Sequence, residues 1–366
     1  MGVSAMLETF VYHYSGLSEV EIRERLSVTI THCVKQRYGE KVHDKIIKRI
    51  EAEWAAMEKS DTILDVALLY EFCTWLKKNN YPYYNRGTTG ASFILWLLGI
   101  TRGNPLSTHI YDRETKTVQF SPSVKDFFYL DYDRSHKNLT GDGHNIPWQV
   151  HWREKLDFCP TFYVDLLVEF EGELLEFFEN HWLKKLRPEV RPCHNGNSLE
   201  FSNLAFVCIW KSLDFSDGFY ENEVEINLLS FPLTNWRSII EDPSIELPDP
   251  LSFSELVTAF GLSKSTGVYD DKVRFMVEKL GLYSHQIAFR EDVFHYFIKY
   301  GYPEKEASRA MEQISFGKGF EDYTLEMMQA VDGWVLDRFD EVEYLFTRAT
   351  AVEFILFQLM RGVGDV

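Results

Sequence analysis

The sequence has neither a long apolar run nor a pair of closely spaced cysteines. Its longest apolar run, ASFILWLLGI, is too short to span a bilayer, which takes about 20 residues. Its five cysteines are scattered without a CxxC pair, at Cys33, Cys73, Cys159, Cys193 and Cys208. We therefore predict no membrane segment, no disulfide framework and no zinc module. We expect a cytoplasmic protein with reduced thiols.

Basic residues are also scarce. The chain carries 38 Lys and Arg against 56 Asp and Glu, so its formal net charge is -18. This charge repels phosphate backbones unless the basic residues cluster, and we expect weak or no binding to duplex DNA. Low-complexity segments and internal repeats are absent too. The chain has 366 residues, of which 45% are hydrophobic and 15% aromatic, enough for a large core or two to three structural domains.

The hydrophobic pattern predicts a helix-rich, mixed α/β (α+β) fold. Residues 17–80 show helical periodicity, with one apolar face formed by Val42, Ile46, Ile50, Trp54 and Met57. Helical patterns return from about residue 235 onward. Strand patterns lie between these regions, in HIYDRETKTVQF, DFFYLDYD, FYVDLLVEFEGE, NLAFVCIWKSL and ENEVEINLLSF. The stretch GELLEFFENHWLKKL is predicted to be a helix whose aromatic residues belong to the core or to an interface. Residues 187–200 are predicted to be a polar connection.

A lone aspartate stands on the strand FYVDLLVEFEGE. Alternation places Tyr163, Asp165 and Leu167 on one face of this strand and apolar residues on the other. Two acids at positions i and i+2 of a strand lie about 6.6 Å apart. Their carboxylates can therefore converge on two metal ions about 3.5–4 Å apart. Asp165 has no such partner, because its neighbours on that face are Tyr163 and Leu167.

The stretch NRGTTGAS is a glycine and threonine loop that leads directly into an apolar helix. Its candidate nucleotide-binding residues are Arg86, Gly87, Thr88, Gly90 and Ser92. Small residues let backbone N–H groups approach a phosphate, and the start of a helix adds its positive dipole end. The same pattern is typical of a helix cap. Binding of a nucleoside triphosphate and capping of the helix are both open interpretations of this loop.

A series of motifs runs through the chain, formed by RGTTGASF, LLGITRGNPLSTHIY, DGHNIPW, VDLLVEFEGE, SFSELVTAFGLSKST, REDVFHYFIKYGYPEKEASRAMEQISFGKGF and EYLFTRATAVEFILFQLMR. In order and approximate spacing this series resembles the catalytic (alpha) subunit of PolC-type DNA polymerase III. The resemblance extends from Leu17 to Arg361. Over this range the chain resembles a degenerate, truncated homologue of that subunit, with palm and fingers only. It implies a nucleotidyltransferase-like palm over residues 1–235 and a helical fingers region over residues 236–366.

In that family three aspartates of the palm hold two metal ions, and two of them lie at i and i+2 on one strand. The ungapped match places Asp165 at the first position and Leu167 at the second. A register shifted by two places Asp165 at the second and Tyr163 at the first. The third aspartate, on a neighbouring strand, corresponds to Asn227, which can ligate only through a neutral carbonyl. Glu169 lies about 13 Å along the strand from Asp165, too far to complete the pair. The resemblance implies that Asp165 is a relict and that Leu167 and Asn227 replace lost aspartates.

Other departures from the family agree with this interpretation. Its insert before Asp-Gly-His carries zinc-type cysteine pairs, and the corresponding stretch here has none, so no structural zinc is expected. The stretch from Leu174 to Leu199 is far too short for the family's thumb. A Lys and a His of its last helix become Arg348 and Thr350. We interpret His144 as a turn residue, and Lys318 as part of either a tight turn or a phosphate contact.

Two function classes follow. The first is a catalytically inactive pseudo-polymerase that acts as a binding or interaction protein linked to DNA replication. A protein partner and a nucleotide are its candidate ligands. The second is an active DNA polymerase or nucleotidyltransferase whose metal ions are held by replacement acids such as Asp165, Glu169 or Glu225. No cofactor is expected in the first class, and Mg²⁺ only in the second.

Overall fold

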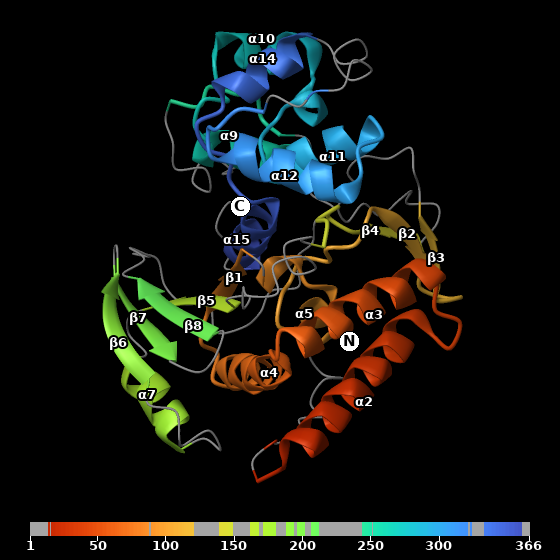
Figure 1. Ribbon diagram of the computed structural model, residues 1–366, viewed down its shortest axis with the longest axis vertical. Helices are drawn as coiled ribbons and strands as arrows, with labels where there is room; N and C mark the ends of the chain where they lie inside the picture. Colours follow the sequence, from red (N-terminus) through yellow and green to blue (C-terminus); the bar gives the residue numbers. More distant parts are fainter. Residues whose placement is uncertain are drawn as a thin grey trace. The chain divides into compact units, whose positions relative to one another are not determined.

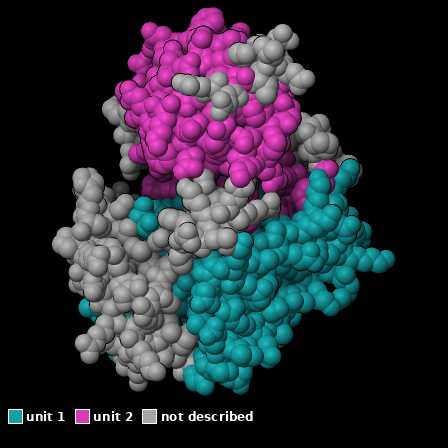
Figure 2. All heavy atoms as spheres, viewed as in Figure 1, with its two compact units in different colours: residues 1–105, 111–119, 152–225 teal, residues 106–110, 120–151, 226–366 magenta. Residues whose placement is uncertain are grey.

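The computed structural model describes residues 14, 16–87, 89–120, 139–148, 162–167, 171–180, 188–193, 196–201, 206–211, 244–250, 252–320, 323 and 333–360. The chain forms two compact units (Figure 2). Unit 1 consists of residues 1–105, 111–119 and 152–225, and unit 2 of residues 106–110, 120–151 and 226–366. The assignment of residues 1–235 to a palm and 236–366 to fingers remains a prediction.

Unit 1 contains three long helices, α2 Glu19–Tyr38, α3 Asp44–Lys59 and α4 Ile63–Lys78 (Figure 1). A capping box starts α2, because the N–H of Ser18 donates to the Glu21 carboxylate at 2.8 Å and the Ser18 hydroxyl accepts from the N–H of Glu21. Buried Ile46 and Met57 lie on the apolar face predicted for α3. The helices predicted over residues 17–80 are therefore confirmed.

The large sheet of unit 1 has the strand order β1-β5-β8-β7-β6 (Figure 1). Its strands are β1 Tyr83–Arg86, β5 Phe162–Leu167, β6 Pro188–Cys193, β7 Gly196–Phe201 and β8 Phe206–Lys211. β5 and β8 are parallel, and the other neighbouring pairs are antiparallel. The strands predicted in FYVDLLVEFEGE and NLAFVCIWKSL are confirmed as β5 and β8.

The polar connection predicted over residues 187–200 is wrong, because β6 and β7 form a hairpin there and extend the sheet. β6 is an edge strand, and such a strand tolerates Pro188 and Pro192 because its outer edge has no ladder to complete. These prolines and the HNGN stretch are turn signals, which is why the sequence pattern missed the hairpin. Asn85 and Arg86, predicted as the start of a loop, likewise belong to a strand, because β1 pairs with β5.

The chain also forms shorter elements. A three-stranded sheet has the order β3-β2-β4, with β2 His109–Asp112, β3 Thr117–Phe120 and β4 Leu139–Asp142. β2 and β3 confirm the strand prediction for HIYDRETKTVQF. The helix α7 Glu171–Asn180 confirms the described part of the acidic-aromatic helix. The strands predicted in DFFYLDYD and ENEVEINLLSF lie outside the described residues.

Unit 2 is helical over most of its described residues, as the sequence predicts. Its helices are α9 Phe253–Lys264, α10 Asp271–Leu280, α11 Arg290–Lys299, α12 Glu304–Ser315, α14 Gly333–Glu341 and α15 Arg348–Met360. Gly267, before α10, has φ +75, and a Cβ there would come within 2.2 Å of the Glu341 carbonyl oxygen. Arg338, almost fully buried, pairs with Asp270 at 2.6 Å. No helix in the described part of the chain is both long and apolar enough to cross a membrane.

Candidate functional site

The antiparallel pairing of β1 with β5 brings two of the predicted site residues together. Tyr84 lies opposite Asp165, and Arg86 lies opposite Tyr163, so all four residues share one face of the sheet. Nε of Arg86 donates to Oδ1 of Asp165 at 3.0 Å. The Arg86 guanidinium also lies over the Tyr163 ring, 4.5 Å from its centre. The lone strand aspartate therefore has a partner, and that partner is a cation of the protein itself.

The burial of this pair is asymmetric. Asp165 is 1% exposed, whereas the Arg86 side chain keeps 31% of its surface. A buried carboxylate needs a counter-charge and hydrogen-bond donors, because transfer of an unpaired charge out of water is very costly. Arg86 supplies both in a fixed geometry, and its outer part remains in contact with solvent.

The other neighbours of Asp165 in the sheet offer no second carboxylate. β5 lies between β1 and β8 in the sheet, and Ile209 of β8 lies opposite Asp165. Leu167 follows at i+2 as the last residue of β5, and Asn227 lies outside the described residues. Within the described ranges, no three His, Cys, Asp or Glu residues are grouped so that they could hold a metal ion. A two-metal site relies on several oxygen ligands, and in the described parts of β1 and β8 no carboxylate lies opposite Asp165.

The loop after β1 is held inside the unit by its own small side chains. Gly87 has φ +61, a left-handed conformation that suits glycine. Thr89 and Gly90 are buried in a short 3-10 helix, Thr89–Ala91, and the Thr89 hydroxyl accepts from the N–H of Tyr163 at 2.9 Å. This bond ties the loop to β5 beside Asp165. Thr88 lies outside the described residues.

The helix after this loop is α5 Phe93–Leu97, and a buried glutamate of α3 caps its N-terminus. The carboxylate of Glu53 accepts from the Ser92 hydroxyl at 2.7 Å and from the N–H groups of Phe93 and Ile94 at 2.9 and 3.0 Å. Arg49, which pairs with Glu53, also donates to the carbonyl of Ala91 at 2.8 Å. The N–H groups that a phosphate would use at this helix start are therefore bound to a carboxylate of the protein.

The loop is interpreted either as a helix cap or as a site for a nucleoside triphosphate. The hydroxyl oxygen of Ser92 accepts from the N–H of Leu95, so Ser92 caps α5 as the first interpretation predicts. Binding of a nucleotide by the loop stays a prediction. Sequence reasoning missed Glu53, although a signal was present. Its spacing from Ile46 and Met57 places this acid on the apolar face of α3, where an acid requires an internal partner.

Comparison with known proteins agrees with the motifs in this region. Residues 24–182 match the model of the bacterial DNA polymerase III alpha NTPase domain. DNA polymerase III PolC-type of Mycoplasmopsis pulmonis is 29% identical over 110 residues, which are 29% of this chain and 8% of that protein. The corresponding Staphylococcus aureus protein is 30% identical over 143 residues, which are 38% of this chain and 10% of that protein. This part of the chain is related to PolC-type DNA polymerase III.

The matched segment contains Arg86, Asp165 and the loop between β1 and α5. The chain spans about a tenth of the length of the PolC-type relatives it matches. The remaining motifs of the resemblance, from SFSELVTAFGLSKST onward, lie beyond residue 182.

Two positions that differ from the PolC-type pattern lie at the start of α15. Arg348 is 7% exposed, and its guanidinium pairs with the carboxylate of Asp292. Its N–H donates to the Glu291 carboxylate at 2.9 Å, so an acid of α11 caps α15. The Thr350 hydroxyl shares a hydrogen bond with the Thr347 hydroxyl. Both side chains thus have partners within unit 2.

Two remaining candidate residues, His144 and Lys318, lie in unit 2. His144 is fully buried, and its ring centre lies 5.8 Å from that of Phe253. Lys318 is exposed in a tight turn between Gly317 and Gly319, whose φ angles are +66 and +62. Lys318 therefore lies in the turn that one interpretation predicts, and a phosphate contact stays a prediction.

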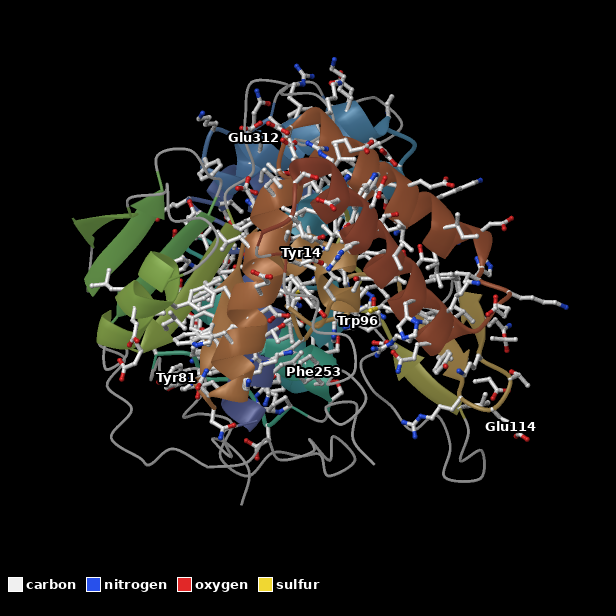
Figure 3. All side chains as sticks on the ribbon, turned by 90° about the horizontal axis from the view of Figure 1, so that it is seen from below. Tyr14, Tyr81, Trp96, Glu114, Phe253 and Glu312 are labelled. Carbon is white, nitrogen blue, oxygen red and sulfur yellow. The ribbon has the colours of Figure 1, made fainter. Side chains whose placement is uncertain are left out.

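The aromatic residues of α7 pack against α4. The rings of Phe177 and Phe178 lie 5.3 and 5.1 Å from that of Phe72, and Phe177 lies 4.9 Å from Trp75. Tyr81, labelled in Figure 3 near the end of α4, joins them through Trp75 at 5.2 Å. For the described part of the aromatic run, these contacts agree with the prediction of a core or interface position.

Proposed function

We propose that the protein is a non-catalytic pseudo-polymerase that acts by binding other molecules. In this proposal residues 1–235 correspond to the palm of a PolC-type enzyme and residues 236–366 to its fingers. The observation that carries the proposal is the ion pair between Arg86 and Asp165, in which Asp165 is 1% exposed. An internal cation thereby neutralises the strand aspartate that, in this proposal, corresponds to a metal-binding aspartate of the family.

The charge balance of this pair supports inactivity. Two-metal phosphoryl transfer needs carboxylates that can converge on both ions. An ion that approached Asp165 would first have to displace the Arg86 guanidinium. Even then, a metal ion bound to Asp165 would find no second carboxylate at position i+2, because that residue is Leu167.

The connection between β5 and β8 supports the same conclusion. This stretch contains α7 and the hairpin of β6 and β7, and the hairpin belongs to the same sheet as β5. A PolC-type enzyme inserts a thumb here to hold the primer-template duplex. Because phosphoryl transfer depends largely on the positioning of the reacting groups, a chain without that insertion has little to hold a primer end.

The binding role follows from charge. A formal net charge of -18 opposes contact with nucleic-acid backbones and favours a protein partner. The relation to PolC-type enzymes connects such a partner with DNA replication, and the loop from Arg86 to Ser92 makes a nucleotide a second candidate ligand. The alternative function is an active nucleotidyltransferase with replacement acids.

Primer extension tests the proposal directly. The wild-type protein, Asp165→Asn and the double variant Leu167→Asp/Asn227→Asp are incubated with a primed template and Mg²⁺ or Mn²⁺, beside an active PolC-type enzyme. We expect no extension by any of the three, because the double variant restores acids but not the thumb. Extension by the wild type that is lost in Asp165→Asn establishes the alternative.

A metal titration gives a second readout. A metal ion that binds only the folded protein stabilises the fold by roughly 2.7 kcal/mol when its concentration is about a hundred times its dissociation constant. We expect no Mg²⁺-dependent rise in the melting temperature of the wild type. A saturable rise that Asp165→Asn abolishes contradicts the proposal.

A further inference from the structure

Two aromatic side chains of unit 2 are exposed in direct contact with one another. Phe316, directly after α12, is 55% exposed, and Tyr344, between α14 and α15, is 38% exposed. Their ring centres lie 6.4 Å apart with an interplanar angle of 51°. Aromatic rings are enriched at the centres of protein interfaces, because they bury a large area with little loss of side-chain entropy.

The backbone holds this ring pair in place. After α12 the chain turns through Gly317 and Lys318, whose N–H groups donate to the carbonyls of Ile314 and Gln313 at 3.0 Å each. The N–H of Leu345 donates to the carbonyl of Ser315 at 3.0 Å and so joins the two segments that carry the rings. A surface that is already ordered loses little entropy when a partner binds.

A second contact fixes Tyr344 from its other side. Its carbonyl accepts from the N–H of Thr266 at 2.9 Å, and its own N–H donates back to Thr266 at 3.2 Å. The aromatic pair is therefore presented by three chain segments that are hydrogen-bonded to one another. Substitution of either exposed ring removes surface without breaking these backbone bonds.

Two acids belong to the segment that carries Tyr344, because Asp340 and Glu343 precede this residue in the chain. The turn packs so closely on the Tyr344 segment that a Cβ on Gly317 would lie 3.0 Å from the Glu343 carbonyl. A Cβ on Gly319 would lie 4.0 Å from Oδ1 of Asp340. Both acids are exposed, and the exposed basic side chain described in this turn is Lys318. We call Phe316, Lys318, Asp340, Glu343 and Tyr344 the Phe316 surface.

We propose that the Phe316 surface binds an arginine-rich protein segment with apolar side chains between its basic residues. Guanidinium groups stack on aromatic faces and donate to carboxylates, so the arginines of such a segment have both kinds of partner on this surface. The apolar side chains of the partner cover Phe316. A nucleic-acid strand is disfavoured, because stacking platforms for single strands are combined with basic grooves.

This inference goes beyond the proposed function, since all of its residues belong to unit 2 and it holds whether or not the Asp165 site is catalytic. The probe is a fluorescein-labelled peptide of alternating arginine and leucine, titrated with the full chain and followed by fluorescence anisotropy. Phe316→Ser and Glu343→Lys are the test variants. Phe275→Ser and Glu278→Lys on α10 are the matched controls, with similar exposure and the same change in charge.

We expect Phe316→Ser and Glu343→Lys each to weaken peptide binding about tenfold, as for residues at the centre of an interface. The two α10 variants are expected to bind like the wild type. Circular dichroism confirms that all four variants remain folded. Equal weakening by Glu343→Lys and Glu278→Lys overturns the proposal, because general attraction to an acidic chain then explains the binding.

Three other results also overturn it. The first is the absence of peptide binding by the wild type. The second is binding of a single-stranded oligonucleotide that Phe316→Ser abolishes, which assigns the surface to nucleic acid. The third is self-association of the chain in sedimentation that Phe316→Ser abolishes, which assigns the surface to a second copy.

Discussion

The exchange Arg86→Met tests whether an internal cation holds Asp165 in the sheet. Methionine keeps an unbranched apolar side chain over the Tyr163 ring but removes the charge and the donor. The Asp165 carboxylate then remains buried without the hydrogen bond that Nε of Arg86 donates at 3.0 Å. The paired carboxylate is 1% exposed, so little solvent can compensate for the loss.

The expected loss follows from the burial of the two partners. Removal of one partner of a fully buried ion pair costs about 3–5 kcal/mol. Because the Arg86 side chain is 31% exposed, solvent screens part of the interaction, and we expect a loss of about 2–3 kcal/mol. Asp165→Asn in the Arg86→Met background removes the buried charge that Arg86 no longer balances. The coupling between the two positions is therefore expected to be about 1–3 kcal/mol.

Urea unfolding followed by circular dichroism measures these free energies. Arg274→Met is the matched control, because Arg274 is 39% exposed and its acidic partners are 69% and 93% exposed. This surface exchange is expected to change stability by less than about 0.5 kcal/mol. The reasoning is refuted if Arg86→Met behaves like Arg274→Met, or if the two positions show no coupling.

Three further predictions concern single residues. Glu53→Ala removes the carboxylate that caps α5 and is expected to lower the free energy of unfolding by about 2–4 kcal/mol, because buried donors lose their acceptor. The exposed control Glu51→Ala is expected to change it by less than about 0.5 kcal/mol in the same urea titration. Gly267→Ala is expected to lower the melting temperature more than Gly281→Ala. Both glycines have positive φ, but a Cβ meets a backbone carbonyl at 2.2 Å at the first position and nothing within 4 Å at the second; equal losses would contradict this packing argument. Burial acts to raise the pKa of Asp270, but its hydrogen bonds and its ion pair with a guanidinium outweigh burial and lower the pKa. A lowered pKa contributes stability that is present above the unfolded-state pKa of about 4 and is lost as the pH falls through the folded-state value. Asp270→Asn is therefore expected to flatten the acid side of a plot of melting temperature against pH, and an unchanged acid side would show that this carboxylate contributes nothing there.

Much of the fold could be predicted from local pattern. The helices over residues 17–80 and the helices of unit 2 follow from apolar spacing, which repeats within a few residues and does not depend on distant partners. The relation to PolC-type enzymes was visible in the order of the motifs. The single acid among Tyr163, Asp165 and Leu167 was visible from strand alternation. The hairpin of β6 and β7 was missed, because its pairing with β8 stabilises strands that have prolines and polar residues.

Only the tertiary structure decided which charged groups meet. Arg86 and Asp165 are separated by 79 residues, and Glu53 and Ile94 by 41 residues. No periodicity relates residues at such separations, because strand pairing and helix packing bring them together. The sequence alone therefore predicted a strand aspartate without an acidic partner and a loop that could bind phosphate or cap a helix. The pairing of β1 with β5 placed a guanidinium on that aspartate, and the packing of α3 placed a carboxylate at the start of α5, since each buried charge requires a partner of opposite charge or a set of donors.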